Sequence, residues 1–235
     1  MSSDAVVQLG GFGPNADLVQ NVDPSHLAAR VSLRPLEHAP IGGPVGGHYR
    51  MVFGFSNTAA KPAASSDIVS LRWLDPRFLF VLRSLKASIV TTTPYTATLN
   101  QDLALFKASG FSVAASAGTQ VLPVAGTAQR LRAGNMAPTL LGAGGGLLWV
   151  SSGDALTVGT RTLDTQGCGY GAFLNAITTP NEPKELTLFD APPGTHPIVL
   201  GTNEGLVIQT PIGNGQAAGV SKFTFTMDWS EVPAF

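Results

Sequence analysis

An unbroken alternation near the C-terminus, KFTFTMDWS over Lys222–Ser230, constrains the fold more than any other stretch. Every second residue is large and apolar, and the residues between are polar. The apolar residues are Phe223, Phe225, Met227 and Trp229. Because successive strand side chains point to opposite faces, the pattern predicts a strand with one buried and one wet face. The strand-like stretch Gly205–Pro211 precedes it across the glycine-rich loop Ile212–Ser221, so we predict a long hairpin that closes the domain.

Further short runs rich in β-branched and aromatic residues follow one another along the chain, with almost no amphipathic helical stripe. They are Met51–Ser56, Ile68–Trp73, Phe78–Thr92, Leu99–Ala108, Leu147–Val150, Ala155–Val158, Tyr170–Thr178 and Glu185–Phe189. About eight or nine strands at such spacings are typical of a β-sandwich. No segment repeats at a fixed period, which argues against a solenoid or propeller. We predict an all-β fold, a β-sandwich of jelly-roll type with an extended N-terminal arm.

Residues 1–47 differ from the rest, because they are rich in Gly, Pro, Asp and Asn and hold only short apolar pieces. In one of them, Val31 and Leu33 alternate with polar residues before Pro35, which predicts an edge strand or a strand end. We predict an arm over 1–47 and the sandwich over 48–235; a partly disordered tail is the alternative. The candidate partner-binding residues of the arm are Leu18, Val19, Val22, Leu27, Val31, Leu33 and Leu36.

Charged residues make up 12% of the chain, against roughly 25% in ordinary soluble domains. The net charge is −1 and no basic patch appears, which argues against a nucleic-acid partner. Few charges suggest that much of the surface is buried against other molecules. A monomer with a surface of Ser, Thr and Gly is the alternative.

The single cysteine, Cys168, excludes an internal disulfide, and we expect it to be a small buried residue. The N-terminus lacks the basic and apolar regions of a signal peptide, so we expect synthesis in a cytoplasm. The most apolar stretch, Met136–Val150, contains a proline and a glycine cluster and is shorter than the roughly 20 residues of a membrane-spanning helix. We therefore expect no membrane partner.

No catalytic, cofactor or metal signature appears in the sequence. The histidines are scattered, GAGGG at Gly142–Gly146 lacks the lysine of a phosphate loop, and no G-x-S-x-G elbow occurs. We expect Trp229 to lie in the core and Trp73 to be the more exposed tryptophan. We therefore predict no enzyme and no cofactor, although acidic residues from distant strands can converge for glycoside cleavage.

Several strings in the chain resemble a group of tailed-bacteriophage proteins that are described as virion structural proteins. The strings run in the same order from about residue 28 to the C-terminus, outside the glycine-rich middle. They include GGHYRMVFGFS, SLRWLDPRFLFVLRSLKASI, LFDAPPGTHPIVLGTNEGLVIQTP and FTMDWSEV. The resemblance implies a place in the virion and brings no catalytic residues with it.

The resemblance, the arm and the low charge together suggest a head decoration (cement) or minor capsid protein on the capsid surface. On this hypothesis the sandwich forms homotrimers. The arm, from Leu18 to Pro40, ties them to the major capsid protein, to other virion subunits or to neighbouring copies. A tail or fibre component that binds the host surface is the alternative, and a glycan-degrading enzyme is a third possibility.

Overall fold

The structure is a computed structural model of the 235-residue chain. It describes residues 7–8, 19–20, 47–56, 64–95, 100–123, 128–130, 139–142, 144–153, 155–174, 183–192, 196–211 and 219–234. The chain divides into two units, Met1–His38 and Ala39–Phe235. In the first unit, β1 (Val7–Gln8) pairs antiparallel with β2 (Val19–Gln20). The predicted edge strand around Val31 lies outside the described residues.

The second unit consists of two antiparallel sheets that pack as a β-sandwich, and its described residues contain no helix. The seven-stranded sheet has the order β10-β6-β14-β4-β9-β7, with β11 also paired to β6. Its strands are β4 (Ser66–Trp73), β6 (Asn100–Ser109), β7 (Gly118–Val121), β9 (Gly146–Ser151), β10 (Thr162–Leu163), β11 (Gly169–Leu174) and β14 (Glu204–Thr210). The six-stranded sheet has the order β12-β5-β15-β3-β8, with β13 also paired to β5. Its strands are β3 (His48–Ser56), β5 (Phe78–Thr93), β8 (Ala128–Arg130), β12 (Lys184–Asp190), β13 (Ile198–Leu200) and β15 (Val220–Pro233).

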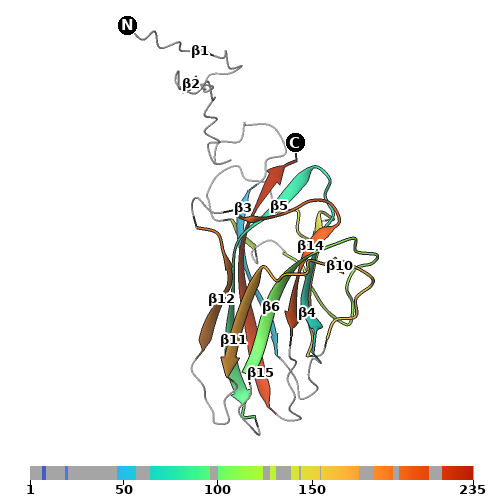
Figure 1. The fold of residues 1–235 in the computed structure, drawn as a ribbon, viewed down its shortest axis with the longest axis vertical. Coiled ribbons are helices and arrows are strands. Elements are labelled where there is room, and N and C mark those ends of the chain that lie inside the picture. The colour runs from blue at the N-terminus through green and yellow to red at the C-terminus, as the bar shows by residue number, and fades with distance from the viewer. Residues whose placement is uncertain are drawn as a thin grey trace. The chain divides into compact units, whose positions relative to one another are not determined.

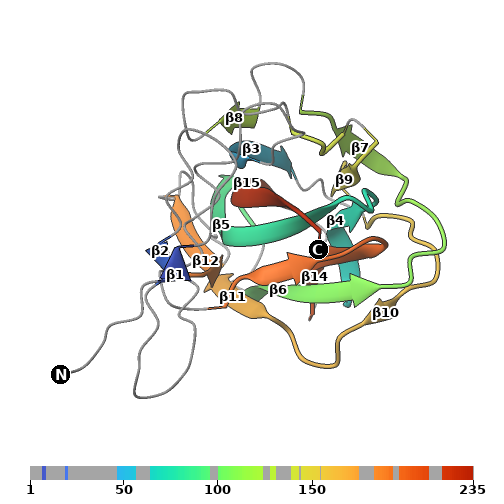
Figure 2. The same cartoon turned by 90° about the horizontal axis from the view of Figure 1, so that it is seen from above.

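Eight of these strands have the connectivity of a jelly roll, which confirms the predicted fold class. Counted along the chain, they are β3, β4, β5, β6, β11, β12, β14 and β15. The first, eighth, third and sixth form one sheet (β3-β15-β5-β12), and the second, seventh, fourth and fifth form the other (β4-β14-β6-β11). This interleaving is two Greek keys wound over two sheets. Figures 1 and 2 show the two layers, with β12, β5, β15 and β3 on one side and β11, β6, β14 and β4 on the other.

The predicted hairpin of the last two strands is wrong, because β14 and β15 lie in opposite sheets. β14 pairs with β4 and β6, whereas β15 pairs with β3 and β5. Alternation shows which face of a strand is buried, and it does not show which strand lies beside it. Packed sheets lie about 10 Å apart, so the connection of residues 211–219 is long enough to pass from one sheet to the other.

The predicted core face of β15 is confirmed: Phe223, Phe225, Met227 and Trp229 are at most 3% exposed. Three of them stack on aromatic residues directly opposite on β3. The pairs and their centroid distances are Phe223–Phe55 at 5.0 Å, Phe225–Phe53 at 5.4 Å and Trp229–Tyr49 at 5.4 Å. Each such pair adds about 0.5–1.5 kcal/mol beyond the burial of its area. The register of β3 on β15 is therefore fixed by a ladder of aromatic pairs.

Two single-residue expectations are wrong. Trp73 is fully buried rather than exposed, and its Nε1–H donates to the Phe78 carbonyl at 2.6 Å. Leu71 and Trp73 share the inward face of β4. The indole therefore enters the core from the seven-stranded sheet, and β15 lies in the other sheet. Cys168 is exposed rather than buried. Its backbone N–H donates to the Leu105 carbonyl at 2.7 Å, so the backbone holds this position and the thiol points to solvent.

Residues 110–168, between β6 and β11, form an insertion into the jelly roll, which we call the β6–β11 insertion. It adds β7, β9 and β10 to the seven-stranded sheet and β8 to the six-stranded sheet. The sandwich therefore has more strands than the sequence predicts. The strand predicted at Ala155–Val158 is wrong, because this stretch contributes only an isolated bridge between Thr157 and Ser116.

Candidate interaction surface

The predicted arm residues are largely outside the part of the chain that the structure describes. Leu18, Val22, Leu27, Val31, Leu33 and Leu36 lie outside it. Val19 lies in β2, where its Cα partner is Gln8. The division of the chain falls after His38, and β3 begins at His48. The role of the arm in binding a partner stays a prediction.

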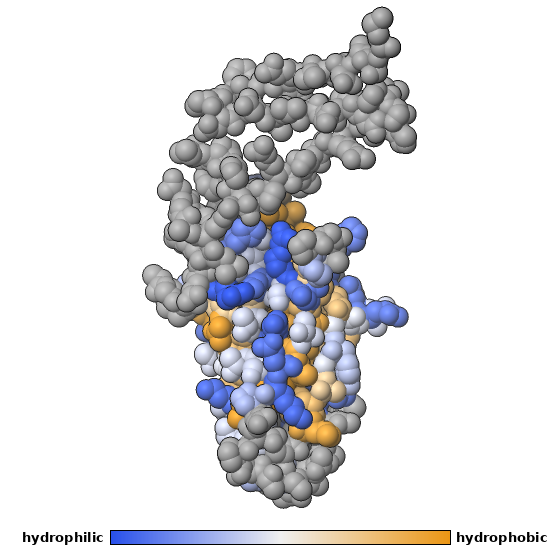
Figure 3. Space-filling model, turned by 90° about the vertical axis from the view of Figure 1, so that its left-hand side faces the viewer, coloured by the Kyte–Doolittle hydropathy of each residue, from blue (hydrophilic) through white to orange (hydrophobic). Residues whose placement is uncertain are grey.

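The outer face of the six-stranded sheet carries two ion pairs between neighbouring strands. Arg50 lies opposite Asp228 and donates two hydrogen bonds of 2.6 Å to its carboxylate. Lys86 Nζ contacts Glu185 Oε1 at 2.8 Å on the neighbouring strands. Figure 3 shows a band of hydrophilic residues on the side of the molecule where β12 lies in Figure 1. Exposed pairs of this kind contribute roughly 0–1 kcal/mol each, so they add little to the stability of the sheet.

The outer face of the seven-stranded sheet is partly covered by the β6–β11 insertion. Phe111 packs there on Ala108 and Val207, with Leu163 at the edge of the cluster. The guanidinium of Arg72 lies 6.0 Å from the centroid of the Phe111 ring. Phe111 lies two residues after the end of β6, and Leu163 lies in β10, which pairs with the end of β6, so both ends of the insertion contribute to this cluster.

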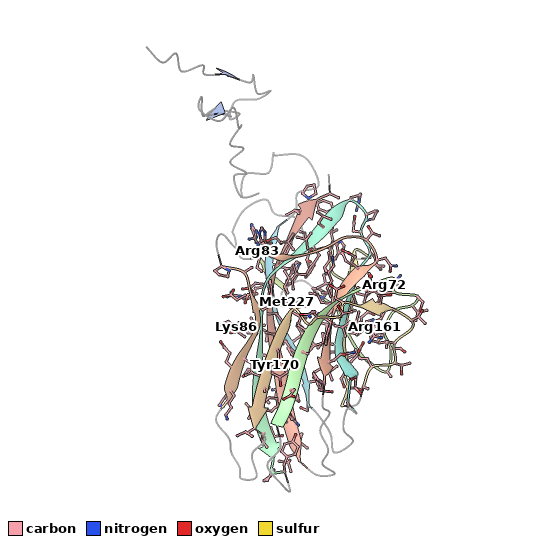
Figure 4. All side chains as sticks on the ribbon, in the orientation of Figure 1. Arg72, Arg83, Lys86, Arg161, Tyr170 and Met227 are labelled. Carbon is pink, nitrogen blue, oxygen red and sulfur yellow. The ribbon has the colours of Figure 1, made fainter. Side chains whose placement is uncertain are left out.

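A buried ion pair fastens this covering to the sheet. Arg161 Nη2 donates to Asp67 Oδ1 at 2.5 Å, and Gln209 Nε2 donates to the same oxygen at 2.8 Å. Burial raises the pKa of Asp67, and the hydrogen bonds from Gln209 and Arg161 oppose that shift. Figure 4 shows Arg161 and Arg72 on the side of the molecule away from Lys86. This buried carboxylate therefore ties the insertion to β4 and β14.

One strand presents apolar side chains that the insertion leaves exposed. On β11, the consecutive outward positions are Tyr170, Ala172 and Leu174, which we call the β11 strip. Tyr170 is 59% and Leu174 50% exposed, and Ala172 between them is also exposed. The tyrosine hydroxyl donates to Asp102 on β6, and this hydrogen bond raises the pKa of Tyr170. Figure 4 shows Tyr170 on the outside of β11.

The β11 strip differs from the other exposed apolar residues in being continuous. The other large exposed apolar side chains of the described residues are Val52, Val113, Leu122 and Val199, and no two of them share a strand. Tyrosine is enriched at protein interfaces, because its ring adds contact area and its hydroxyl stays hydrated. The strip is thus the best candidate interaction surface in the described part of the chain.

Sequence reasoning predicted the strand and missed the strip. In YGAFL, Tyr170 and Leu174 alternate with Gly171 and Phe173, so apolar residues fall on both faces. The structure turns Phe173 into the core at 6% exposure, which leaves Tyr170 and Leu174 outside. Gly171 was the residue in the sequence that could have indicated the buried face. Because it has no side chain, its face of β11 can pack closely on Leu186 of β12.

Within the described residues, no three or more His, Cys, Asp or Glu side chains gather as a metal site would require. His48 Nδ1 lies 2.6 Å from Ser230 Oγ, and His196 is exposed, so these two histidines lie in different surroundings. No helix in this part of the chain is long and apolar enough to span a membrane.

No protein-family model matches the sequence, and no curated protein does either. The fold assigns the chain to the jelly-roll β-sandwiches.

Proposed function

We propose that the chain is a structural protein of a tailed-bacteriophage virion, a head decoration (cement) or minor capsid protein. The observation that carries the proposal is the jelly roll with a continuous apolar strip on β11. Jelly rolls recur in viral capsid proteins. The phage-like strings support it further, because they cover β3, β4, β5, β14 and β15 of the jelly roll.

In this role the sandwich forms homotrimers on the shell, and residues 18–40 anchor it to the major capsid protein or to neighbouring copies. A charge content of 12% supports a surface that is buried in an assembly. The β11 strip supplies apolar contact area outside the arm. Neither contact requires a cofactor, a nucleic acid or a membrane.

Quantitative mass spectrometry of purified virions tests the position in the particle. A copy number on the order of hundreds per particle supports the head. A handful of copies per particle contradicts it and favours a tail or vertex.

The anchoring role is tested with a truncation that lacks residues 1–45. The truncated protein should retain the sandwich, as judged by its far-UV spectrum, and lose binding to purified capsids. If the full-length protein is monomeric and the truncation still binds capsids normally, the proposal fails.

A tail or fibre component that binds the host surface is the second candidate. The exposed ring of Tyr170 favours it, because lectins also use jelly rolls and an aromatic ring can stack on a sugar. Saturable binding to host cells or purified glycans that is lost in Tyr170→Ala would support this function. Retained binding in that variant would leave the aromatic ring without a role in recognition.

A further inference from the structure

A chain of buried aromatic rings ends the core near the C-terminal end of β15. Tyr49 stacks on Trp229 at 5.4 Å, Trp229 on Phe80 at 5.9 Å, and Phe80 lies 5.5 Å from Trp73. All four residues are at most 1% exposed. Such rings need a cover, because the sheets alone leave the ends of a sandwich open.

Part of the cover comes from the β6–β11 insertion, through residues 139–142 and 144–146, which we call the cap. Leu141 of the cap is 1% exposed and belongs to the same core. Gly146 packs directly on the indole of Trp73, where a β-carbon would lie 2.8 Å from Cε3. Only glycine permits this approach. The cap therefore closes over the aromatic rings by backbone contact and one leucine.

The main polar anchor of the cap is the carboxylate of Glu231 on β15, which is 1% exposed. Its Oε1 accepts from Thr139 Oγ1 at 2.5 Å and from Trp229 Nε1 at 3.1 Å. Its Oε2 accepts from the Leu140 N–H at 3.0 Å. Glu231 forms no ion pair among the described residues. One buried carboxylate thus joins the last strand of the fold to the cap. It does so by accepting hydrogen bonds from neutral O–H and N–H groups.

The other hydrogen bonds that join the cap to the sheets come from the backbone, and Gly146 itself pairs with Trp73 of β4. The Gly145 carbonyl accepts from the N–H groups of Leu74 and Asp75 at 2.8 and 3.0 Å. Within the cap, Gly142 donates to Gly146 and Gly145 to Leu140. Gly142 and Gly144 have φ of +82° and +93°. Glycines regain the most backbone freedom on release, so opening the cap gains conformational entropy that its contacts must offset.

We propose that the cap is a closure over the aromatic end of the core, and that Glu231 holds it shut. Loss of the carboxylate opens the cap and exposes Trp73 and Trp229, while the two sheets stay folded. The inference is independent of the proposed virion function, because it uses only contacts within one chain. It makes Glu231 a positioning residue for the insertion.

Glu231→Gln is a sharp test, since an amide has the same shape and cannot satisfy the site. Donors face both carboxylate oxygens, so either orientation of the amide directs its NH₂ group at a donor. The expected result is hydrogen exchange at Leu140–Gly145 that is at least about tenfold faster than in the wild type. Exchange in β6 and β14 should stay unchanged.

A second readout uses tryptophan fluorescence. In a Trp149→Phe background only Trp73 and Trp229 remain, and Glu231→Gln should make both more accessible to acrylamide. Asp67→Asn is the matched control, because Asp67 is also a buried carboxylate and anchors a different part of the insertion through Arg161. That control should leave exchange in the cap unchanged.

Unchanged exchange in the cap of Glu231→Gln would overturn the proposal. Equal acceleration in the cap, β6 and β14 would also overturn it, since the cap would then open only with global unfolding. If Glu231→Gln does not fold, Thr139→Ala replaces it, because this variant keeps the carboxylate and removes one donor. Faster exchange confined to the cap of Thr139→Ala supports the closure, and unchanged exchange contradicts it.

Discussion

At the scale of single residues, folding shifts the pKa values of two carboxylates, Glu231 and Glu204, in opposite directions. Burial raises the pKa of Glu231 above its ordinary value of 4.5, although Thr139 and Trp229 donate to it. Burial also favours a higher pKa for Glu204, but the hydrogen bond from the Gly201 N–H and the charge of Lys107 outweigh it, so the pKa of Glu204 is lowered. The Gly201 hydrogen bond measures 2.7 Å and the Lys107 ion pair 2.9 Å. The two residues should therefore give stability opposite dependences on pH.

We expect the stability deficit of Glu231→Gln to narrow as the pH rises. A raised pKa means that the folded state holds the proton more tightly than the unfolded state. The contribution of Glu231 is therefore complete below the ordinary pKa and is lost as the pH rises through the raised one. Urea unfolding of the wild type and the variant across a series of pH values measures the difference.

For Glu204→Gln the same measurement should show a deficit that widens with pH. A carboxylate with a lowered pKa stabilises the folded state when the pH is above its ordinary pKa. This contribution is lost as the pH falls through the lowered pKa of the folded state. The variant removes only that contribution. Two deficits that change in the same direction with pH would contradict the assignment of either carboxylate.

At the scale of elements, β15 is the strand on which the six-stranded sheet depends. It pairs with β5 over its whole length and with β3 over nine residues. Its inward residues stack on β3 and fill the core, and the outward residues Thr224, Thr226 and Asp228 are partly exposed. One strand therefore offers a matched pair of neighbouring test positions.

We expect Phe225→Ala to lower the free energy of unfolding by about 3–5 kcal/mol, because it leaves a cavity and removes a stacked pair. Thr226→Ala, one residue along on the outer face, should cost less than about 1 kcal/mol. Denaturant titration gives both values. Equal costs would mean that the two faces of β15 are not distinct.

The sequence predicts elements of this kind well and their partners poorly. The alternation in β3, β5 and β15 shows which residues face the core, and the jelly roll follows from the many short strands without helices. The hairpin of β14 and β15 is wrong because alternation carries no information about the neighbouring strand. Trp73 was misplaced for a related reason: a strand in a sandwich can bury its largest residue at the very end, where another segment caps it.

The candidate surface was the harder part to predict. Tyr170 and Leu174 differ from Phe173 only in the face of β11 to which they belong, and that face is set by the contact of Gly169 and Gly171 with β12. The buried Asp67–Arg161 pair joins residues far apart in the chain. Neither feature leaves a local pattern. The predicted arm residues lie outside the described part, so their role remains a prediction.

At the scale of the whole molecule, the two faces of the sandwich should differ in their contribution to assembly. The six-stranded face carries paired charges, and the β11 strip on the other sheet is apolar. We expect Leu174→Asp to weaken self-association by about tenfold or more, because a buried charge is costly in an interface.

Val52→Asp is the control, since Val52 is 57% exposed on the six-stranded sheet. It should leave association unchanged, and neither variant should shift the thermal midpoint by much, because both side chains are exposed. Sedimentation equilibrium measures the association of all three proteins. Association of Leu174→Asp at wild-type strength would exclude the β11 strip as the contact between copies.

The pairing of the first and last strands of the jelly roll has a consequence for biosynthesis. β3 and β5 each bond to β15, and β15 separates them in the sheet. A nascent chain that has already released both strands from the ribosome therefore holds two unpaired edges until β15 emerges. Ribosomes deliver the chain at about 5–20 residues per second. The polypeptide thus spends seconds with the facing edges of β3 and β5 unpaired before β15 is made.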